Sequence, residues 1–304
     1  MEKKDCRTDG EGRIKMATVS APDLNACERA YVDHLGYEVV ERGVINEELA
    51  KSWEAPGQAG SPYIIVGPES GAKVYIRFVE NDPVPGYKPL STFGWNAIEI
   101  TVQDADKLHE QLKSSPFEII GVPTYLDFSD AIYPMQVVGP AGEVIYLNQV
   151  NGSLPDYDLP LARSFVDHIF IMILATPDMQ TGVDFYREAL GWSQGNSYEV
   201  AYSVINDAFN FPADRKHKLS MNCVGRIVNN EVDQYPPETT ERPKKEGMLP
   251  PGIATVSYIT QSLDKVNAPF ITDPATHDGQ PYEGRRTATC RGSTGELVEL
   301  IEQP

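Results

Sequence analysis

Apolar residues recur at helical spacing in two stretches that share their flanking residues. The first, VSAPDLNACERAYVDHLGY, spans residues 19–37, and the second, LATPDMQTGVDFYREALGW, spans residues 174–192. Asp23 and Asp178 precede the apolar positions, and Gly36 and Gly191 follow them. A short carboxylate caps a helix N-terminus and glycine ends a helix at a left-handed position. Each stretch therefore predicts a strand end, a capped helix and a glycine stop, repeated within one chain.

Strand-like runs surround these helices and divide the chain into repeating units. Turn-rich segments separate four βαβββ modules, at residues 13–80, 95–150, 165–232 and 253–304. In the third module, residues 198–205 and 218–228 are predicted as strands, and the Pro-rich and charged residues 229–252 as an exposed loop. The prediction is an α+β chain with a flexible tail (1–12), two tandem module pairs (13–150 and 165–304) and a linker (151–164).

Composition narrows the possible partners. The formal net charge is −18, which disfavours nucleic acid and anionic membranes, since both recruit Lys and Arg. The N-terminus lacks the apolar core of a signal peptide, and no run reaches the roughly 18 apolar residues of a membrane helix. The four cysteines show no paired spacing and favour reduced thiols. These features predict a cytoplasmic protein.

The two helix stretches, together with the closing strands GPAGEVIYL and GSTGELVEL, carry a family resemblance. The chain resembles the vicinal oxygen chelate superfamily, which includes glyoxalase I, bleomycin-resistance proteins and extradiol dioxygenases. The resemblance implies glyoxalase-like domains, each a curled mixed sheet that forms a cup for a small molecule, with helices outside. It also implies a divalent metal in many members, and a homodimer is possible.

The metal pattern of that superfamily is mostly missing from this chain. Ligands are expected seven residues before the helix-starting Asp and four residues after the closing glycine, on the first and last strands of a module. The matching residues include Met16, Ile171 and Tyr146, which are unsuited to a divalent cation, and only Glu299 fits. We therefore expect no metal cofactor. Should a divalent metal bind, His168 and Glu299 are the candidate ligands, although His168 has the wrong strand parity for the cup.

The first domain offers a different chemistry. Tyr75 and Arg77 from one module and Tyr146 and Asn148 from the next occupy equivalent strand positions, and are predicted to line one cup. Tyrosine can donate a hydrogen bond to a carbonyl, and arginine can hold an enolate or carboxylate. Glu299, a carboxylate between apolar neighbours, suits a general base. Further candidate substrate contacts are Trp95, Asn96, Glu99, Tyr133 and Gln136.

Three functions follow, and the sequence leaves them open. The first is an isomerase- or lyase-like enzyme without the usual metal, with Tyr146, Arg77 and Glu299 as its catalytic residues. The second is a divalent-metal enzyme of the glyoxalase or dioxygenase type that uses His168 and Glu299. The third is a small-molecule binding or resistance protein without catalysis. All three predict a small oxygenated, partly aromatic or carbonyl ligand.

Overall fold

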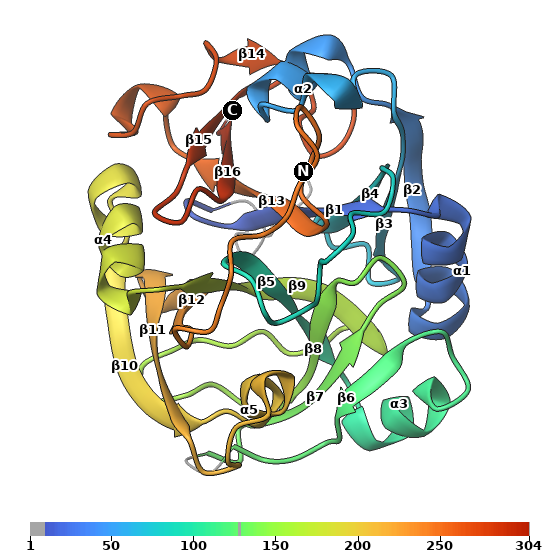
Figure 1. The fold of residues 1–304 in the computed structure, drawn as a ribbon, viewed down its shortest axis with the longest axis vertical. Helices are drawn as coiled ribbons and strands as arrows, with labels where there is room; N and C mark the ends of the chain where they lie inside the picture. Colours follow the sequence, from blue (N-terminus) through green and yellow to red (C-terminus); the bar gives the residue numbers. More distant parts are fainter. Residues whose placement is uncertain (1–9, 127–128, 304) are drawn as a thin grey trace, which may run out of the picture.

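Two eight-stranded mixed sheets lie one above the other, with most helices at their flanks (Figure 1). A computed structural model describes residues 10–126 and 129–303. Sheet 1 has the strand order β14-β15-β16-β13-β1-β4-β3-β2, and sheet 2 has the order β10-β11-β12-β9-β5-β8-β7-β6. This is the α+β class expected from the sequence, with four modules paired into two glyoxalase-like units.

Sheet 1 is built from the first and fourth modules. The first contributes β1 (Ile14–Ala21), α1 (Leu24–Leu35), β2 (Tyr37–Val44), α2 (Glu47–Ser52), a 3-10 turn η1 (Pro56–Gln58), β3 (Pro62–Pro68) and β4 (Tyr75–Glu80). The fourth contributes β13 (Gly252–Thr260), the 3-10 turn η2 (Leu263–Lys265), β14 (Ala275–Thr276), β15 (Arg286–Arg291) and β16 (Leu297–Glu302). The strands β1 and β13 join the two modules as antiparallel neighbours, with Thr18 opposite Thr255.

Sheet 2 is built from the second and third modules. The second contributes β5 (Gly94–Val102), α3 (Ala105–Leu112), β6 (Glu118–Gly121), β7 (Ile132–Val138) and β8 (Val144–Val150). The third contributes β9 (Val166–Thr176), α4 (Met179–Leu190), β10 (Ser193–Ala201), α5 (Ser203–Phe209), β11 (Lys216–Val224) and β12 (Ile227–Gln234). The strands β5 and β9 join these modules in the same antiparallel way.

This pairing corrects the expectation that the first module pairs with the second and the third with the fourth. The chain starts in sheet 1, crosses to sheet 2 after β4, and returns after β12. The two crossing segments lie side by side, since Phe93 donates to the carbonyl of Thr240, and Thr240 donates to that of Ser91. The expected linker, residues 151–164, joins two strands of the same sheet. Sequence neighbours therefore do not form one sheet, because the chain crosses between the sheets twice.

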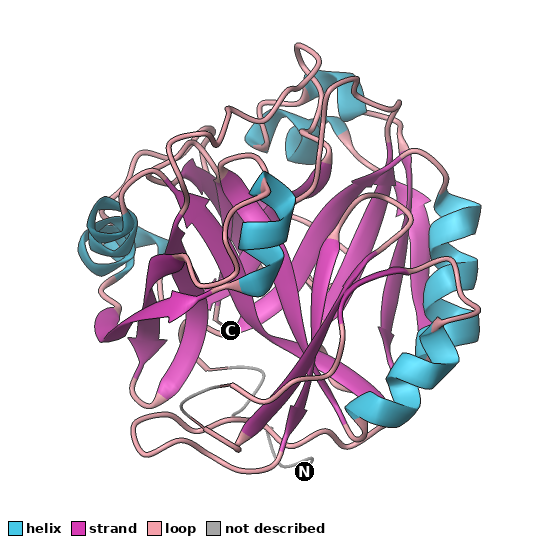
Figure 2. Ribbon diagram, turned by 60° about the horizontal axis from the view of Figure 1, so that its bottom comes forward, coloured by secondary structure: helices cyan, strands magenta, loops and turns pink. Residues whose placement is uncertain are grey.

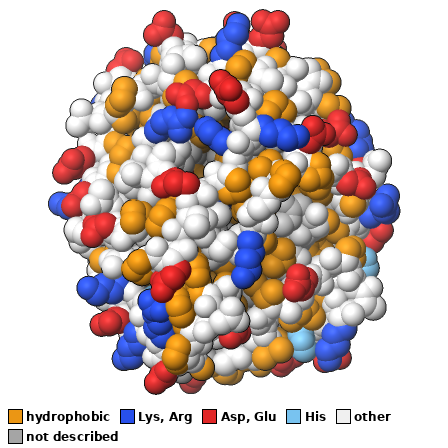
Figure 3. All heavy atoms as spheres, in the orientation of Figure 1, with side chains coloured by type: hydrophobic (Ala, Val, Ile, Leu, Met, Phe, Trp, Pro, Cys, Tyr) orange, Lys and Arg blue, Asp and Glu red, His pale blue; other side chains and the backbone are white. Residues whose placement is uncertain are grey.

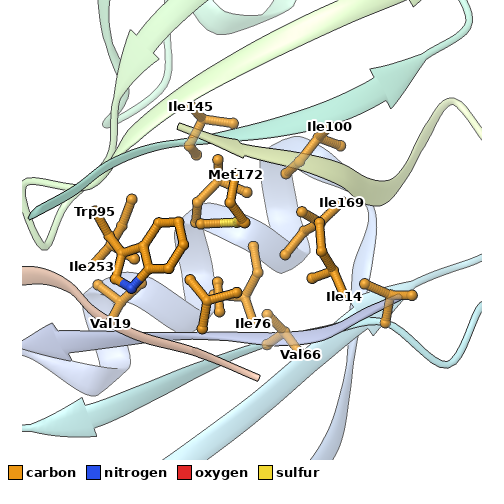
Figure 4. Packing of buried hydrophobic residues seen from close by; sticks show 14 of the residues in the cluster. Ile14, Val19, Val66, Ile76, Trp95, Ile100, Ile145, Ile169, Met172 and Ile253 are labelled. Atoms are coloured by element: carbon orange, nitrogen blue, oxygen red, sulfur yellow. The ribbon is translucent and has the colours of Figure 1, made fainter. Parts of the chain in front are cut away.

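The main hydrophobic core lies between the two sheets. Figure 4 shows side chains from both sheets meeting there, among them Val19, Ile76 and Ile253 from sheet 1 and Ile100 and Met172 from sheet 2. Each sheet therefore has an inner face toward this core and an outer face on the opposite side. The short helices α2 and α5 pack on the two outer faces, α2 on sheet 1 and α5 on sheet 2 (Figure 1).

Repeated residues at the two long helices form matching links between modules. Tyr31 of α1 donates to Glu143 at 2.9 Å, and Tyr186 of α4 donates to Glu296 at 3.0 Å. Each glutamate follows the closing glycine of a hairpin and also accepts backbone N–H groups of that turn. Burial raises the pKa of Glu143 to about 7. The repeated Tyr and Gly-Glu motifs therefore hold the helix of one module to the closing hairpin of the next.

The third module differs most from its predicted elements. Part of the predicted strand 198–205 is the helix α5, and the predicted strand 218–228 is a hairpin of β11 and β12. The predicted loop 229–252 contains most of β12, which pairs with β9. The two capped helices expected in residues 19–37 and 174–192 are present as α1 and α4, whereas α2 was not expected (Figure 2).

Part of the predicted N-terminal tail belongs to the fold. Residues 1–9 of the predicted tail lie outside the described residues, whereas Gly12 donates to the carbonyl of Ile259 and so belongs to the fold. Cys27, Cys223 and Cys290 are buried free thiols, and Cys6 lies outside the described residues. In the described part of the chain, no helix combines the length and apolarity needed to cross a bilayer. Acidic and basic side chains are interspersed on the face in Figure 3.

Candidate functional site

The four modules place chemically different residues at one equivalent position on each outer face. Asp23, Asp104, Asp178 and Ser262 cap the helices or 3-10 turn of the modules. In each module, the residue five positions before the cap lies beside one residue of the last strand. These pairs are Thr18 with Arg77, Glu99 with Tyr146, Ile173 with Glu231, and Ser257 with Glu299. The pairs from sheet 1 and from sheet 2 form two separate candidate sites.

The sheet 1 site, which we call the Arg77 site, is a closed network around Glu299. This carboxylate is fully buried and accepts hydrogen bonds from Trp53 Nε1 at 2.9 Å and from Ser257 Oγ at 2.6 Å. The hydroxyl of Tyr282 lies 3.1 and 3.2 Å from its two oxygens. Arg77 donates to the same Tyr282 hydroxyl at 2.9 Å and to Thr18 Oγ1 at 2.9 and 3.1 Å.

Aromatic rings enclose the cation of the Arg77 site. The Arg77 guanidinium lies 4.6 Å from the centre of the Trp53 ring and 5.7 Å from that of Tyr282. Trp53 follows α2 directly, and both pack into the apolar cluster on the outer face of sheet 1. A buried charged group is tolerated only when hydrogen bonds satisfy it, and here Arg77 and Glu299 both bond to the Tyr282 hydroxyl. These contacts favour a structural role for Arg77 and Glu299.

The sheet 2 site, which we call the carboxylate site, holds three buried acidic side chains. Glu99, Glu231 and Asp233 are at most 8% exposed. Asn148 donates to Glu99 at 2.6 Å, and Tyr202 donates to Glu231 at 3.3 Å. Neither oxygen of Asp233 makes a hydrogen bond of standard geometry with a described residue. No cationic side chain of the described residues is paired with these three carboxyl groups.

Burial and mutual repulsion set the protonation of the carboxylate site. Burial raises the pKa of Glu99 well above its usual value, and the charge of Glu231 adds to the shift. The pKa of Asp233 is raised well above its usual value by the same two causes. Burial also raises the pKa of Glu231. A pKa raised in this way favours the protonated form of a carboxyl group, which a general acid requires.

Tyrosines and α5 cover the carboxylate site. The rings of Tyr146 and Tyr202 lie 6.2 Å apart in an edge-on arrangement. Burial raises the pKa of Tyr146 well above its usual value, so its hydroxyl stays a hydrogen-bond donor. Tyr202 precedes α5, and Val204 of this helix packs against the cluster around Tyr146. His217 Nε2 lies 2.8 Å from Asn206 Oδ1 of α5 and ties the helix to β11.

The structure separates the four residues that the sequence predicted in one cup. Tyr75 and Arg77 lie on β4 in sheet 1, whereas Tyr146 and Asn148 lie on β8 in sheet 2. The prediction of one shared cup was wrong because it assumed that the first two modules pair. Tyr75 is also not the residue equivalent to Tyr146. The pairing of β1 with β4 gives that place to Arg77, because the hairpin before β4 is longer than its counterparts.

The other predicted substrate contacts are spread over sheet 2. Glu99 lies in the carboxylate site, and Gln136 is half-buried opposite Tyr146 on the neighbouring strand. Trp95 lies in the core between the sheets, where its Nε1 donates to the carbonyl of Leu297 at 2.9 Å (Figure 4). Asn96 donates to the carbonyl of Thr92, and Tyr133 donates to Asp106 next to α3. The structure therefore brings two of these five residues to the carboxylate site or its border.

The proposed metal pair is also separated. His168 is on β9 of sheet 2 and Glu299 is on β16 of sheet 1. The expectation that they lie near each other was wrong for the same reason of module pairing. The expectation that His168 has the wrong strand parity fails too. The register between β5 and β9 shifts near Phe170, so the residues on its two sides do not follow one alternation. His168 lines a different cavity, between β9 and residues 152–161.

Sequence reasoning missed several of the residues in these two sites. Glu231 and Asp233 lay in the segment predicted as a loop, although their spacing of two is the alternation of a strand. Tyr202 was assigned to a strand. Trp53 and Tyr282 come from connecting segments that carry no periodic signal.

The two sites differ in how well they fit the divalent metal of the superfamily. In the Arg77 site a guanidinium and two hydroxyls surround one carboxylate whose oxygens already accept hydrogen bonds, so this site does not fit a cation. The carboxylate site offers the oxygen donors that a hard cation prefers. However, no three His, Cys, Asp or Glu side chains of the described residues converge as metal ligands do. Neither site is thus a formed metal centre in the described part of the chain.

Comparison with solved structures identifies the fold. Glyoxalase I from Zea mays superimposes with a TM-score of 0.63 at 16% identity, over 96% of this chain and 92% of that one. A Bacillus subtilis protein that carries the provisional name dioxygenase superimposes with a TM-score of 0.58 at 10% identity, over 97% and 86% of the two chains. The chain thus has the vicinal oxygen chelate fold. No protein-family description and no curated protein matches its sequence.

Proposed function

We propose that this chain is a small-molecule enzyme that uses the carboxylate site to move protons on an oxygenated substrate. The observation that carries the proposal is the group of three buried carboxyl groups without a described cationic partner. Such a group costs stability, because buried charges or like-charged neighbours are unfavourable. Costly titratable clusters of this kind are typical of sites selected for chemistry.

The residues suit proton transfer next to a carbonyl group. One ionised carboxylate, with Glu231 central to the cluster, takes a proton from the carbon beside the carbonyl. The electrons of the C–H bond then form an enolate, whose oxygen accepts a hydrogen bond from Tyr146. In a 2-hydroxy ketone the proton of the neighbouring hydroxyl then passes to the enolate oxygen, and a neutral carboxyl group, Glu99 or Asp233, returns a proton to the former carbonyl carbon, which completes an isomerisation. Loss of a leaving group from the enolate gives a lyase reaction instead.

Access to the site involves α5. Tyr202 and Val204 lie over the carboxylate site, and Tyr202 bonds directly to Glu231. A substrate therefore has to displace this seven-residue helix, and the Tyr202 bond has to break before Glu231 can act. Closure of the helix over the substrate then removes water from the reacting groups, as lids do in other enzymes.

Solvent-deuterium exchange tests the proposal even though the product is unidentified. The protein is incubated in D₂O with a panel of hydroxy ketones, 2-oxo acids and phenolic ketones, and proton NMR follows the loss of C–H signals. We expect the wild-type protein to exchange or convert at least one class, and Glu231→Gln to lose this activity while Glu299→Gln keeps it.

Two other outcomes decide against the proposal. Tight stoichiometric binding with no exchange in any compound supports the alternative of a binding or resistance protein. Activity that appears only after addition of Mg²⁺, Mn²⁺, Ni²⁺, Zn²⁺ or Fe²⁺ supports the alternative of a divalent-metal enzyme.

A further inference from the structure

A cavity of about 430 Å³ lies away from both sites described above. It is formed where the starts of β1, β9 and β12 meet residues 152–161. Cavities of 300–1,000 Å³ are typical of small-molecule sites. We propose that this cavity is a second ligand site, for a compact apolar molecule that carries one carboxylate group.

The apolar part of the cavity comes from three different segments. Ile14 on β1, Phe170 on β9 and Val228 on β12 contribute walls that are at most 8% exposed. Leu161, which is 57% exposed, borders the cavity from the connecting segment. Since these side chains come from rigid strands on three sides, an aromatic or branched hydrocarbon body can bury most of its surface here.

The polar part of the cavity includes three nitrogen-bearing side chains, those of Arg13, His168 and Asn229. Asn229 is 1% exposed, and its Nδ2 donates to no described residue. A buried amide N–H without an acceptor is costly, so a ligand oxygen at this point gains a full hydrogen bond. The Asn229 side chain lies at a bulge of β12, where the register between β11 and β12 shifts. Bulges of this kind re-aim side chains next to functional sites.

His168 and Arg13 give the cavity its preference for an anion. His168 lines the cavity, and its Nδ1 lies 3.1 Å from Asp167 Oδ1. Hydrogen bonds from His168 and other neighbours hold the pKa of Asp167 at about 2 in spite of burial, so that carboxylate stays ionised. Arg13 also lines the cavity, and the acidic Asp158 there is paired with Arg226 at 2.8 Å.

Binding of 2-naphthoate, compared with the neutral 2-naphthalenemethanol, tests this proposal by titration calorimetry on the full chain. We expect one naphthoate per chain, bound at least about tenfold more tightly than the alcohol, since hydrogen bonds to a charged acceptor are the stronger ones. Leu161→Trp, which fills the mouth, and Asn229→Asp, which replaces the donor with a negative charge, are each expected to weaken naphthoate binding at least about tenfold.

Matched variants separate this site from the rest of the molecule. Val122→Trp alters a side chain that is 59% exposed and outside the cavity, and should bind naphthoate like the wild type. Glu231→Gln should also leave binding unchanged, because the carboxylate site is separate. Absence of saturable binding, or unchanged binding in both cavity variants, would overturn the proposal. Loss of binding in Glu231→Gln would overturn it too, because the ligand would then occupy the carboxylate site.

Discussion

The Arg77 site and the carboxylate site occupy equivalent places on two sheets of the same design, yet their charges are arranged differently. Each lies on an outer face, beside a short helix inserted between the second and third strands of a module. In the Arg77 site, Glu299 is saturated with hydrogen bonds and shares Tyr282 with a buried cation. In the carboxylate site, three acidic groups repel one another, and the oxygens of Asp233 lack standard hydrogen bonds to described residues.

This difference teaches how a duplicated scaffold can divide its roles. The hydrogen-bond network of the Arg77 site satisfies its buried charges and holds α2 and Trp53 in place, so the site does not need a ligand for its stability. A group of unpaired carboxyl groups loses stability on burial, and a substrate or proton can relieve that cost. We therefore propose that sheet 1 gives structural support and that sheet 2 carries the chemistry.

The largest expected effect is on turnover. Once a substrate is found by deuterium exchange, Glu231→Gln should lower kcat/KM by about 10²–10⁴-fold, the usual contribution of a general acid or base. The same substitution at the equivalent position of sheet 1, Glu299→Gln, should leave kcat near the wild-type value and lower the melting temperature. A reversed result, with turnover lost only in Glu299→Gln, would exchange the roles of the two sites.

Loss of the cation from the Arg77 site should have the next largest effect. Arg77→Ala removes a buried cation together with its hydrogen bonds to Thr18 and to the Tyr282 hydroxyl that also contacts Glu299, and each buried polar group left without its partner costs about 1–3 kcal/mol of unfolding free energy. The double variant Arg77→Ala/Glu299→Gln should lose clearly less than the sum of the single variants, because residues of one hydrogen-bond network are coupled. Urea unfolding of the four proteins measures this; strict additivity would mean that the two groups do not support one another.

The two equivalent links, Tyr31 with Glu143 and Tyr186 with Glu296, should be equally sensitive to substitutions in their hairpins. A Cβ atom on Gly139 would lie 2.0 Å from Glu143 Oε1, and one on Gly292 would lie 1.8 Å from Glu296 Oε1. We expect Gly139→Ala and Gly292→Ala each to cost about 1–3 kcal/mol, as overpacking does. Gly152→Ala is the control, since nothing lies within 4 Å of its added Cβ. If thermal unfolding shows clearly different losses of stability for Gly139→Ala and Gly292→Ala, the two halves differ in more than their outer faces.

The smallest expected effect is a pH-dependent gain in stability. The pKa values of Glu99, Glu231 and Asp233 are raised in the folded protein, so their protons favour folding. Their contribution is complete below the unfolded pKa near 4 and is lost as pH rises through the folded values. The variant Glu99→Gln/Glu231→Gln/Asp233→Asn should thus be more stable than wild type at pH 8, by at least about 1 kcal/mol. Urea titrations at pH 8 and pH 4 measure this difference in stability, which should be smaller at pH 4.

Local patterns predicted most elements of this fold. The caps at Asp23 and Asp178 and the glycine stops are properties of nearby residues, and the structure confirms them. The module pairing could not be predicted this way, because strands β1 and β13 meet only after the chain has crossed between the sheets twice. The residues of a strand do not by themselves determine which of several similar sheet edges that strand will join.

The polar residues of the candidate site made its strand β12 difficult to predict. Most of β12 lies in a polar segment that carries Asn229, Asn230, Glu231 and Asp233, and such a segment is typical of a loop. The buried environment that turns these residues into a site comes from α5, whose sequence resembles a strand because residues 198–205 alternate. Glu99 and Tyr146 were among the predicted site residues, whereas their partners from the third module were not.

The crossing of the chain between the sheets has a consequence for its synthesis. Sheet 2 uses only residues between Gly94 and Gln234, so all of its strands have been synthesised before β13 begins at Gly252. In the first module, by contrast, the edge of β1 that pairs with β13 stays unpaired until the fourth module has been synthesised. Release of the C-terminal module is therefore the event that closes the molecule, and a chain stopped before Gly252 would carry a finished sheet 2 beside an open strand edge.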